Sequence, residues 1–287
     1  MIEGCVEEGI EVGIVTNGLL IHKHIKALSK CTWVGISLDA GSNETYDKLK
    51  PTNSGRKGSY DKVMANVEKL IAYSKANSTK LVAEGQGSGV SIKYLFTSKN
   101  IGEVYEAALA AKKAGCSNFH ARPASTPWFS LDGETPEFSN HNVEGYITFT
   151  EADVDLFDSQ IEDSRKLEDA TFSIFGIKHK LSGQNFSVAN DFKECHAIFM
   201  TAVIMPSKKR GDFFDIGLCC DRRGDDDLYL GKELTDVEDI ASLWSSPKHW
   251  EVQDKITVTK CPRCTYKPHN IIFEKVIQVD NLTYKFI

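Results

Sequence analysis

Short apolar runs alternate with longer amphipathic stretches through the first 125 residues. Residues 60–76 carry Val63, Val67, Leu70 and Ile71 at helical spacing, and the Ala-rich residues 101–114 are also typical of a helix. A polar, Gly-rich loop is expected at residues 39–58. The apolar runs themselves have the length and composition of buried β-strands, and they lie at residues 11–20, 33–38, 90–96 and 116–121.

This alternation predicts an α/β fold with a parallel sheet and helical crossovers, either an open sheet or a barrel. In such folds the chemistry lies at the carboxyl ends of the strands. Polar residues stand there after three predicted strands, namely Thr16 with Asn17, Ser37 with Asp39, and Arg122. Each has an ordinary structural interpretation, because Asn-Gly is a common turn, Asp a common helix cap and Arg a common partner in surface salt bridges. Their gathering on one edge of the sheet favours a binding site.

The pattern weakens in residues 126–190, which are predicted to bridge two domains. A loop rich in Pro, Gly and Asn is expected at residues 127–145, and an acidic helix at residues 151–169. Further on, the sequence predicts short strands at residues 198–205 and 213–219 and a helix at residues 236–244. The run Asp225-Asp226-Asp227 lacks the alternating ligands and closing Glu of a calcium loop, so a solvated turn is expected.

Composition and charge exclude several classes of partner. The 287 residues, 41% of them hydrophobic, suffice for one large domain and a smaller one. A net charge of −6 without a basic run argues against nucleic acid. No stretch reaches the roughly 18 apolar residues of a membrane span, and the start of the chain, with Glu3, Glu7 and Glu8, does not resemble a signal peptide. We therefore expect no membrane partner and a cytoplasmic location.

Five of the eight cysteines lie after residue 190. Thiolates are soft ligands for zinc and for iron-sulfur clusters, and the two-residue gap of a Cys-x-x-Cys knuckle lets both sulfur atoms reach one metal centre. The spacing alone leaves zinc and iron-sulfur equally open, and buried or disulfide-paired cysteines are the structural alternative. The candidate ligands are Cys195, Cys219, Cys220, Cys261 and Cys264.

The order of these pieces resembles the radical S-adenosylmethionine (radical SAM) family, in particular members with a C-terminal SPASM or twitch extension. The Thr16-Asn17-Gly18 turn is similar to the end of the family's third barrel strand, and Ser37-Leu38-Asp39 is similar to the end of its fourth. The start of the following helix, from Gly58 to Val63, resembles the family's Gly-x-Phe-Asp-x-Val segment. The resemblance implies an incomplete (β/α) barrel at residues 1–125, the bridge at 126–190, and a small α+β cysteine-rich domain at 191–287.

The resemblance also implies cofactors and roles. Cys195, Cys219 or Cys220, Cys261 and Cys264 fit the layout of an auxiliary 4Fe-4S cluster, which favours iron-sulfur over zinc and Cys219 over Cys220. S-adenosylmethionine (SAM) would bind along Thr16, Asn17, Ser37 and Asp39, with its carboxylate at Arg122. In the family, SAM cleavage at a separate cluster gives a 5'-deoxyadenosyl radical that removes a hydrogen atom from substrate. The implied partners are a peptide or small-molecule substrate and a reductant protein.

The family's Cys-x3-Cys-x2-Cys motif does not occur in this sequence, where Cys5, Cys31 and Cys116 stand isolated. The Gly-Gly-Glu type motif is absent as well, and residues 1–10 look like the tail of a helix. We expect a fragment of a longer enzyme that does not cleave SAM alone, because a sheet starting at its third strand would expose an apolar edge. The alternatives are a short form without radical chemistry, a metal-stapled binding module, and an acid-base enzyme using Asp39 and His120.

Overall fold

The computed structural model describes residues 1–51, 58–82, 87–124, 149–177, 192–209, 211–261 and 264–279. The chain divides into two compact units, of which the described residues up to 177 form the first and those from 192 onward the second. The loop predicted at residues 127–145 lies outside the described residues. In the described part of the chain, no helix combines the length and apolar character that a membrane crossing requires.

A five-stranded parallel sheet forms the centre of the first unit. Strands adjacent in sequence are adjacent in the sheet, so all the carboxyl ends lie on one edge. This confirms the predicted α/β class with a parallel sheet. The strands are β1 (Gly13–Thr16), β2 (Trp33–Ser37), β3 (Val90–Phe96), β4 (Asn118–Pro123) and β5 (Ser173–Gly176).

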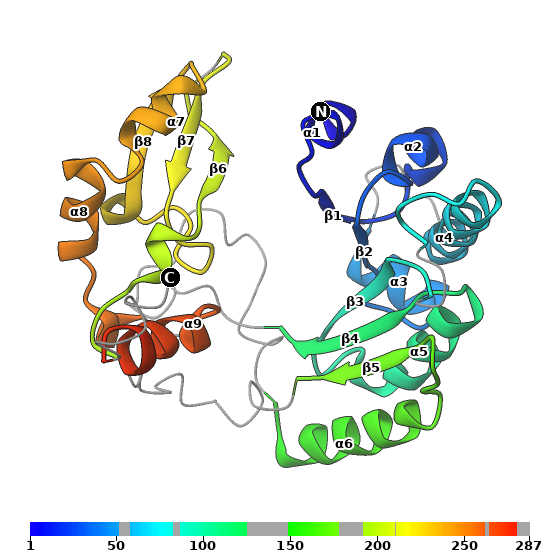
Figure 1. The fold of residues 1–287 in the computed structure, drawn as a ribbon. Helices are drawn as coiled ribbons and strands as arrows, with labels where there is room; N and C mark the ends of the chain where they lie inside the picture. Colours follow the sequence, from blue (N-terminus) through cyan, green and yellow to red (C-terminus); the bar gives the residue numbers. More distant parts are fainter. Residues whose placement is uncertain are drawn as a thin grey trace. The chain divides into compact units, whose positions relative to one another are not determined.

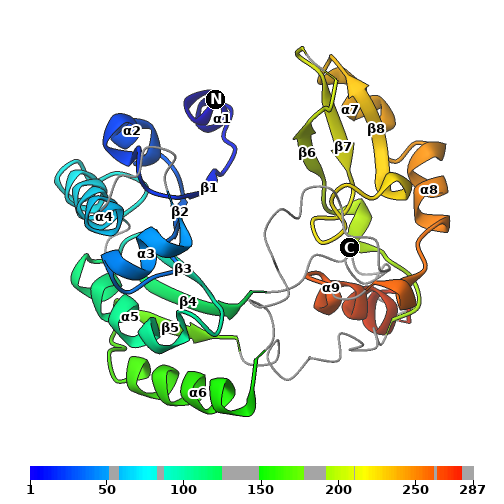
Figure 2. The same cartoon turned by 180° about the vertical axis from the view of Figure 1, so that it is seen from behind.

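Helices connect these strands and lie along one side of the sheet (Figures 1 and 2). The longest, α4, begins where the sequence predicts it and buries Val63, Val67, Leu70 and Ile71. The helical elements of the first unit are α1 (Ile2–Glu7), α2 (Ile21–Leu28), α3 (Asn43–Leu49), α4 (Ser59–Ala76), the short η1 (Ile101–Glu103), α5 (Val104–Lys113) and α6 (Glu151–Arg165).

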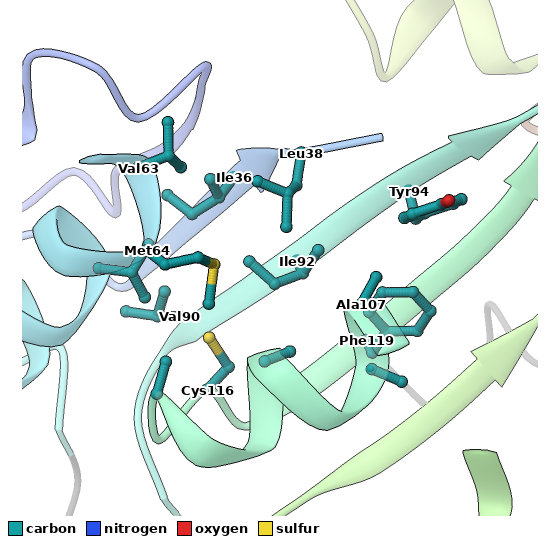
Figure 3. Packing of buried hydrophobic residues seen from close by; sticks show 14 of the residues in the cluster. Ile36, Leu38, Val63, Met64, Val90, Ile92, Tyr94, Ala107, Cys116 and Phe119 are labelled. Carbon is teal, nitrogen blue, oxygen red and sulfur yellow. The ribbon is translucent and has the colours of Figure 1, made fainter. Parts of the chain in front are cut away.

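Alternation along the strands separates two faces of the sheet. Ile36, Ile92 and Phe119 occupy one register row and are fully buried. They point toward the helices, where Met64, Ala107 and Cys116 lie in the same cluster (Figure 3). The intervening positions of the strands form the opposite face, which is less buried. We call it the open face; it includes Trp33, Ser37, Ser91, Lys93, His120, Arg122 and Phe175.

Three parts of the first unit differ from the sequence prediction. The expected loop at residues 39–58 contains helix α3, because the Ser42 side chain caps its first turn and Glu103 accepts hydrogen bonds from Gly41 and Thr45. The described part of the predicted bridge, residues 149–177, belongs to the first unit: α6 confirms the predicted acidic helix, and β5, which was not predicted, pairs with β4. Strand β1 was predicted to be buried, yet it pairs only with β2 among the described strands, and Val15 is 64% exposed.

The second unit is built on a three-stranded antiparallel sheet of β6 (Val203–Pro206), β7 (Phe214–Gly217) and β8 (Tyr229–Leu234). Strand β8 was not predicted, and the strand expected from residue 198 begins later because η4 (Ala197–Phe199) precedes it. The remaining elements are η5 (Asp226–Leu228), α7 (Glu238–Leu243), α8 (Pro247–Asp254), η6 (Val258–Lys260), α9 (Lys267–Ile272) and the π-helical turn η7 (Phe273–Ile277).

Candidate functional site

The first candidate residues form the turn after β1. The backbone N–H of Gly18 donates to Thr16 Oγ1 at 3.3 Å, and that of Leu19 donates to Asn17 Oδ1 at 3.1 Å. Gly18 has φ +80°, and a Cβ there would lie 2.7 Å from Val63 on α4, so this turn requires glycine. Asn66 on α4 donates to the Gly18 carbonyl at 2.9 Å. The turn is therefore fixed against α4, with Thr16 and Asn17 serving its local hydrogen bonds.

Asp39, after β2, is engaged through both carboxylate oxygens. Oδ1 accepts the backbone N–H of Leu95 at 2.7 Å, and Oδ2 lies 2.7 Å from Nζ of Lys50 and 3.3 Å from the Ser37 hydroxyl. Its φ of 57° is a strained value for a residue other than glycine. Asp39 therefore connects the end of β2 to β3 and orients Ser37 and Lys50. The negative charge of this buried carboxylate is balanced by its ion pair with Lys50.

Arg122 lies near the end of β4 on the open face and is exposed. Two ionisable residues share this face with it. Burial, and to a smaller extent the charge of Arg122, lower the pKa of Lys93. Burial, followed by the charges of Lys93 and Arg122, lowers the pKa of His120 to about 4, so this histidine is neutral at pH 7. An imidazole with this pKa is almost wholly unprotonated at neutral pH and has the low basicity of a structural or binding residue rather than a general base.

In the second unit, Asn270 links two of the candidate cysteines. Asn270 is fully buried on α9, and its Oδ1 accepts the backbone N–H groups of His196 and Ala197 at 2.8 and 2.9 Å. These two bonds fix the orientation of the amide, because only its oxygen accepts. Its Nδ2 therefore faces sulfur, 3.9 Å from Cys195 and 3.7 Å from Cys264.

A second connection brings the loop after β7 to the Cys261–Cys264 knuckle. Asp221 accepts from the backbone N–H of Thr265 at 2.6 Å and from its hydroxyl at 3.0 Å. The Nη1 of Arg222 donates toward Cys261 Sγ at 3.8 Å. Residues next to Cys220 and Cys264 therefore hold these segments together, although more than 40 positions separate them in the sequence.

The thiols of this group interact electrostatically. Burial raises the pKa of Cys264 to about 12, and the neighbouring charges of Cys195 and Cys219 raise it as well. Burial likewise raises the pKa of Cys219 to about 11 and that of Cys195, where Cys261 adds to the effect. Cys220 instead interacts with the Tyr266 side chain. We call Cys195, Cys219, Cys261 and Cys264 the cysteine group.

All eight cysteines are free. Cys31 and Cys116 are buried in the core of the first unit, as isolated residues, and Cys5 lies in α1. Among the described residues, no three Cys, His, Asp or Glu side chains are arranged to hold a single metal ion. The Asp225–Asp227 run forms the η5 turn, in which Asp225 pairs with Arg222 and Asp226 with Lys232.

Three contributors were missed by the sequence reasoning: Lys50, Lys93 and Asn270. Lys93 had a signal, since it interrupts an apolar strand at a position that alternation places with Ser91, on the face opposite Ile92. Lys50 and Asn270 had no such signal in the sequence. Their roles arise from contacts with Asp39, 11 positions away, and with Cys195, 75 positions away.

Comparisons with known proteins show a family similarity in part of the first unit and a similar fold in one solved structure. The profile of the Radical SAM superfamily matches residues 2–82. Among solved structures, the crystal structure of Streptococcus suis SuiB is similar, with a TM-score of 0.55 and 14% sequence identity. The match covers 93% of this chain and 59% of the SuiB chain, so this chain spans less than two thirds of SuiB. At this identity the likeness concerns the fold alone.

No curated protein matches the sequence significantly. The profile match covers α1, β1, α2, β2, α3 and α4, together with the Thr16-Asn17-Gly18 turn and the Ser37-Leu38-Asp39 strand end. The fold that follows in the first unit continues the same parallel sheet. Residues 2–82 are therefore similar to the Radical SAM superfamily.

Proposed function

We propose that this chain is a portion of a radical SAM enzyme that carries an auxiliary 4Fe-4S cluster on its cysteine group. The similarity of residues 2–82 to the Radical SAM superfamily implies SAM and a 4Fe-4S cluster, which together supply a 5'-deoxyadenosyl radical. The 287 residues contain no Cys-x3-Cys-x2-Cys motif, so we propose that the ligands of the SAM-cleaving cluster lie outside them. A peptide or small-molecule substrate and a reductant protein are the partners that this function requires.

The observation that carries the auxiliary cluster is the convergence of four cysteines from three separate segments. Asn270 lies between the sulfur atoms of Cys195 and Cys264, while Cys219 and Cys261 act electrostatically on these two. Burial raises the pKa of Cys195, Cys219 and Cys264, so their thiolate forms are unfavourable unless a cation offsets the negative charge. A metal centre supplies the positive charge and favours the thiolate forms.

The order of the cysteines favours a cluster over a single zinc ion. Zinc holds its sulfur ligands at about 2.3 Å from one point. In a 4Fe-4S cluster each thiolate binds a different iron. A leading Cys195, a cysteine after β7 and a late Cys-x-x-Cys knuckle resemble the layout of the family's auxiliary cluster, so we propose iron-sulfur.

Cys219 is the better candidate for the fourth ligand. The charge of Cys219 raises the pKa of Cys264, whereas Cys220 forms a side-chain hydrogen bond with Tyr266. The charges of both cysteines also raise the pKa of Tyr266, and that of Cys220 raises the pKa of Cys219. The two cysteines are adjacent and both half-buried, which makes them a matched pair for mutagenesis.

In the first unit, Ser37 and Arg122 are the candidates for direct contact with SAM, since Arg122 has no ion-pair partner within the described residues. The ends of β1 and β4 stand about 14 Å apart along the sheet, at about 4.8 Å per strand, so only an extended ligand reaches both. Asp39 acts through Ser37 and Lys50, and Thr16 and Asn17 shape the turn.

Anaerobic reconstitution with iron and sulfide tests the cluster. We expect about four iron atoms per chain to remain bound after desalting. Reduction should then give an electron paramagnetic resonance (EPR) signal. Cys219→Ala should lose or alter that signal, and Cys220→Ala should keep it. Stoichiometric zinc without iron, or equal behaviour of the two variants, would contradict the proposal.

A separate measurement tests the proposed division of the enzyme. The reconstituted, reduced chain should release no 5'-deoxyadenosine from SAM. The DNA directly upstream of the Met1 codon should encode the three-cysteine motif in frame. Production of 5'-deoxyadenosine by the isolated chain would refute this part of the proposal and leave the cluster assignment standing.

A further inference from the structure

Within the described residues, the open face of the sheet contains positive charge with no carboxylate to balance it. The five strands include no Asp or Glu, and their ionisable residues on this face are Lys93, His120 and Arg122. Lys93 pairs in register with His120, and Arg122 lies two residues further along β4. Within the described residues, neither Lys93 nor Arg122 forms an ion pair. The carboxylate of Asp39, which follows β2, is already held by Lys50 and by the Leu95 backbone.

The indole ring of Trp33 forms a flat aromatic surface beside these charges. Its ring lies over Gly35, where a Cβ atom would collide with it, and 3.3 Å from the place of a Cβ at Gly13 on β1. The indole Nε1 donates to Ser91 Oγ at 2.9 Å, which holds the ring flat across three strands. Nζ of Lys93 lies 4.7 Å from the ring centroid. The glycines of β1 and β2 thus leave room for an indole surface on which Lys93 rests.

The register row of Lys93 continues through His120 on β4 to Phe175 on β5 and is also aromatic. The His120 and Phe175 rings lie 4.5 Å apart between centroids, and Phe175 is 46% exposed although it is a large apolar side chain. Burial of Lys93 and repulsion by Arg122 both lower the pKa of Lys93. In a chain with net charge −6, this local excess of positive charge meets no carboxylate in the described contacts. Unbalanced cations in an aromatic setting are typical of a site whose anion comes from a ligand.

We propose that the open face binds a ligand carboxylate between Lys93 and Arg122, with the planar or apolar part of the ligand lying against Trp33. Arg122 supplies two N–H donors in the geometry of a carboxylate, and Lys93 supplies a point charge. The proposal rests on the proposed function and narrows it, since the carboxylate belongs either to the substrate or to the methionyl end of SAM. Lys93 is the new element of this site.

Nuclear magnetic resonance tests the site on the full chain without any cluster. The indole N–H signal of Trp33, assigned with Trp33→Phe, reports changes near this ring separately from the other three tryptophans. We titrate 3-phenylpropionate and its uncharged counterpart 3-phenylpropionamide. The acid should shift this signal and bind at least about tenfold more tightly than the amide, the size expected for a charge-assisted hydrogen bond.

Lys93→Met and Arg122→Met should each reduce that preference about tenfold, whereas Lys113→Met, at the end of α5, should leave it unchanged. Equal affinity for acid and amide, or no shift with either, would overturn the proposal. A second pair separates the two sources of the carboxylate. If S-adenosylhomocysteine shows the Lys93-dependent preference over 5'-methylthioadenosine, the subsite holds the methionyl end of SAM; if only the phenylpropionate pair shows it, the subsite belongs to the substrate. These binding assays and the iron analysis can fail independently.

Discussion

The two units of this chain reach their folds by different physical means. In the first, five strands present a continuous buried face to the helices, and its core includes Ile92, Tyr94 and Phe119 with exposures of 0%. In the second, the core is a group of six buried residues that centres on Ile216 and Leu218, and Cys195 and Cys219 pack against it. The first unit is therefore held by apolar burial, and the second combines a small core with a group of thiols.

The difference indicates where a metal centre contributes to stability. A small unit with few buried apolar residues depends on staples, and metal binding adds directly to its folding free energy. The first unit needs no such staple, and its polar residues are instead placed at the carboxyl edge and on the open face. Four perturbations test this contrast.

The largest expected effect follows removal of the cluster. Chelation of iron from the reconstituted chain should raise amide hydrogen exchange in residues 192–279 at least about a hundredfold, the change that corresponds to losing a ligand held at a hundred times its Kd. Residues 1–124 should keep their protection. Hydrogen-exchange mass spectrometry of the two forms provides the comparison, and unchanged protection of the second unit would show that its small core suffices.

The second perturbation targets the apolar core. Phe119→Ala should lower the free energy of unfolding of the first unit by about 3 to 5 kcal/mol, because the ring is fully buried and leaves a cavity. The iron content should not change. Denaturant titration followed by circular dichroism measures the loss, with Leu156→Ala on α6 as the control, since Leu156 is 40% exposed. A loss of iron in Phe119→Ala would mean that the two units are coupled.

The third perturbation acts on the thiol environment. Asn270→Asp keeps the oxygen that accepts from His196 and Ala197 but removes the N–H groups that face Cys195 and Cys264. The reduction potential of the cluster should fall on the order of 50 mV, about 1 kcal/mol for one electron, because the reduced cluster loses donors and gains a negative neighbour. EPR-monitored redox titration measures the shift. Gln278→Glu, an exposed change that adds the same charge, should leave the potential near that of the wild type.

The smallest effect concerns pH. The pKa of His120 is about 4 in the folded chain and about 6.5 when unfolded, since burial and the charges of Lys93 and Arg122 oppose protonation. Between these values the unfolded chain binds the extra proton, so the stability of the first unit falls as the pH drops from 6.5 to 4. His120→Gln should make the fall in Tm between pH 6.5 and pH 4 smaller by about 2 to 4 °C. The effect is modest because part of the His120 ring faces solvent. An equal effect of His22→Gln, an exposed change on α2, would exclude the burial argument.

Predictability of the fold followed the strength of the local pattern. Strand β3 and helix α4 match their predicted bounds within one residue, because each buries one regular stripe. Strand β5 has only four residues, and its pairing with β4 is a distant contact that the local sequence does not encode. Helix α3 depends on Glu103, which lies about 60 positions away. Strand β8 contains Gly231 and a positive φ at Glu233, which obscure its alternation.

The sequence by itself determined which reactive and polar groups the chain contains: its thiols, the polar residues that end the strands, and the family that those strand ends resemble. Tertiary structure decided how each group is used. It turned Asp39 toward Lys50, placed Asn270 between two sulfur atoms and set Lys93 beside Trp33 and Arg122. The reason is physical, because hydrogen-bond partners and neighbouring charges depend on distance in space, which only the packed fold establishes.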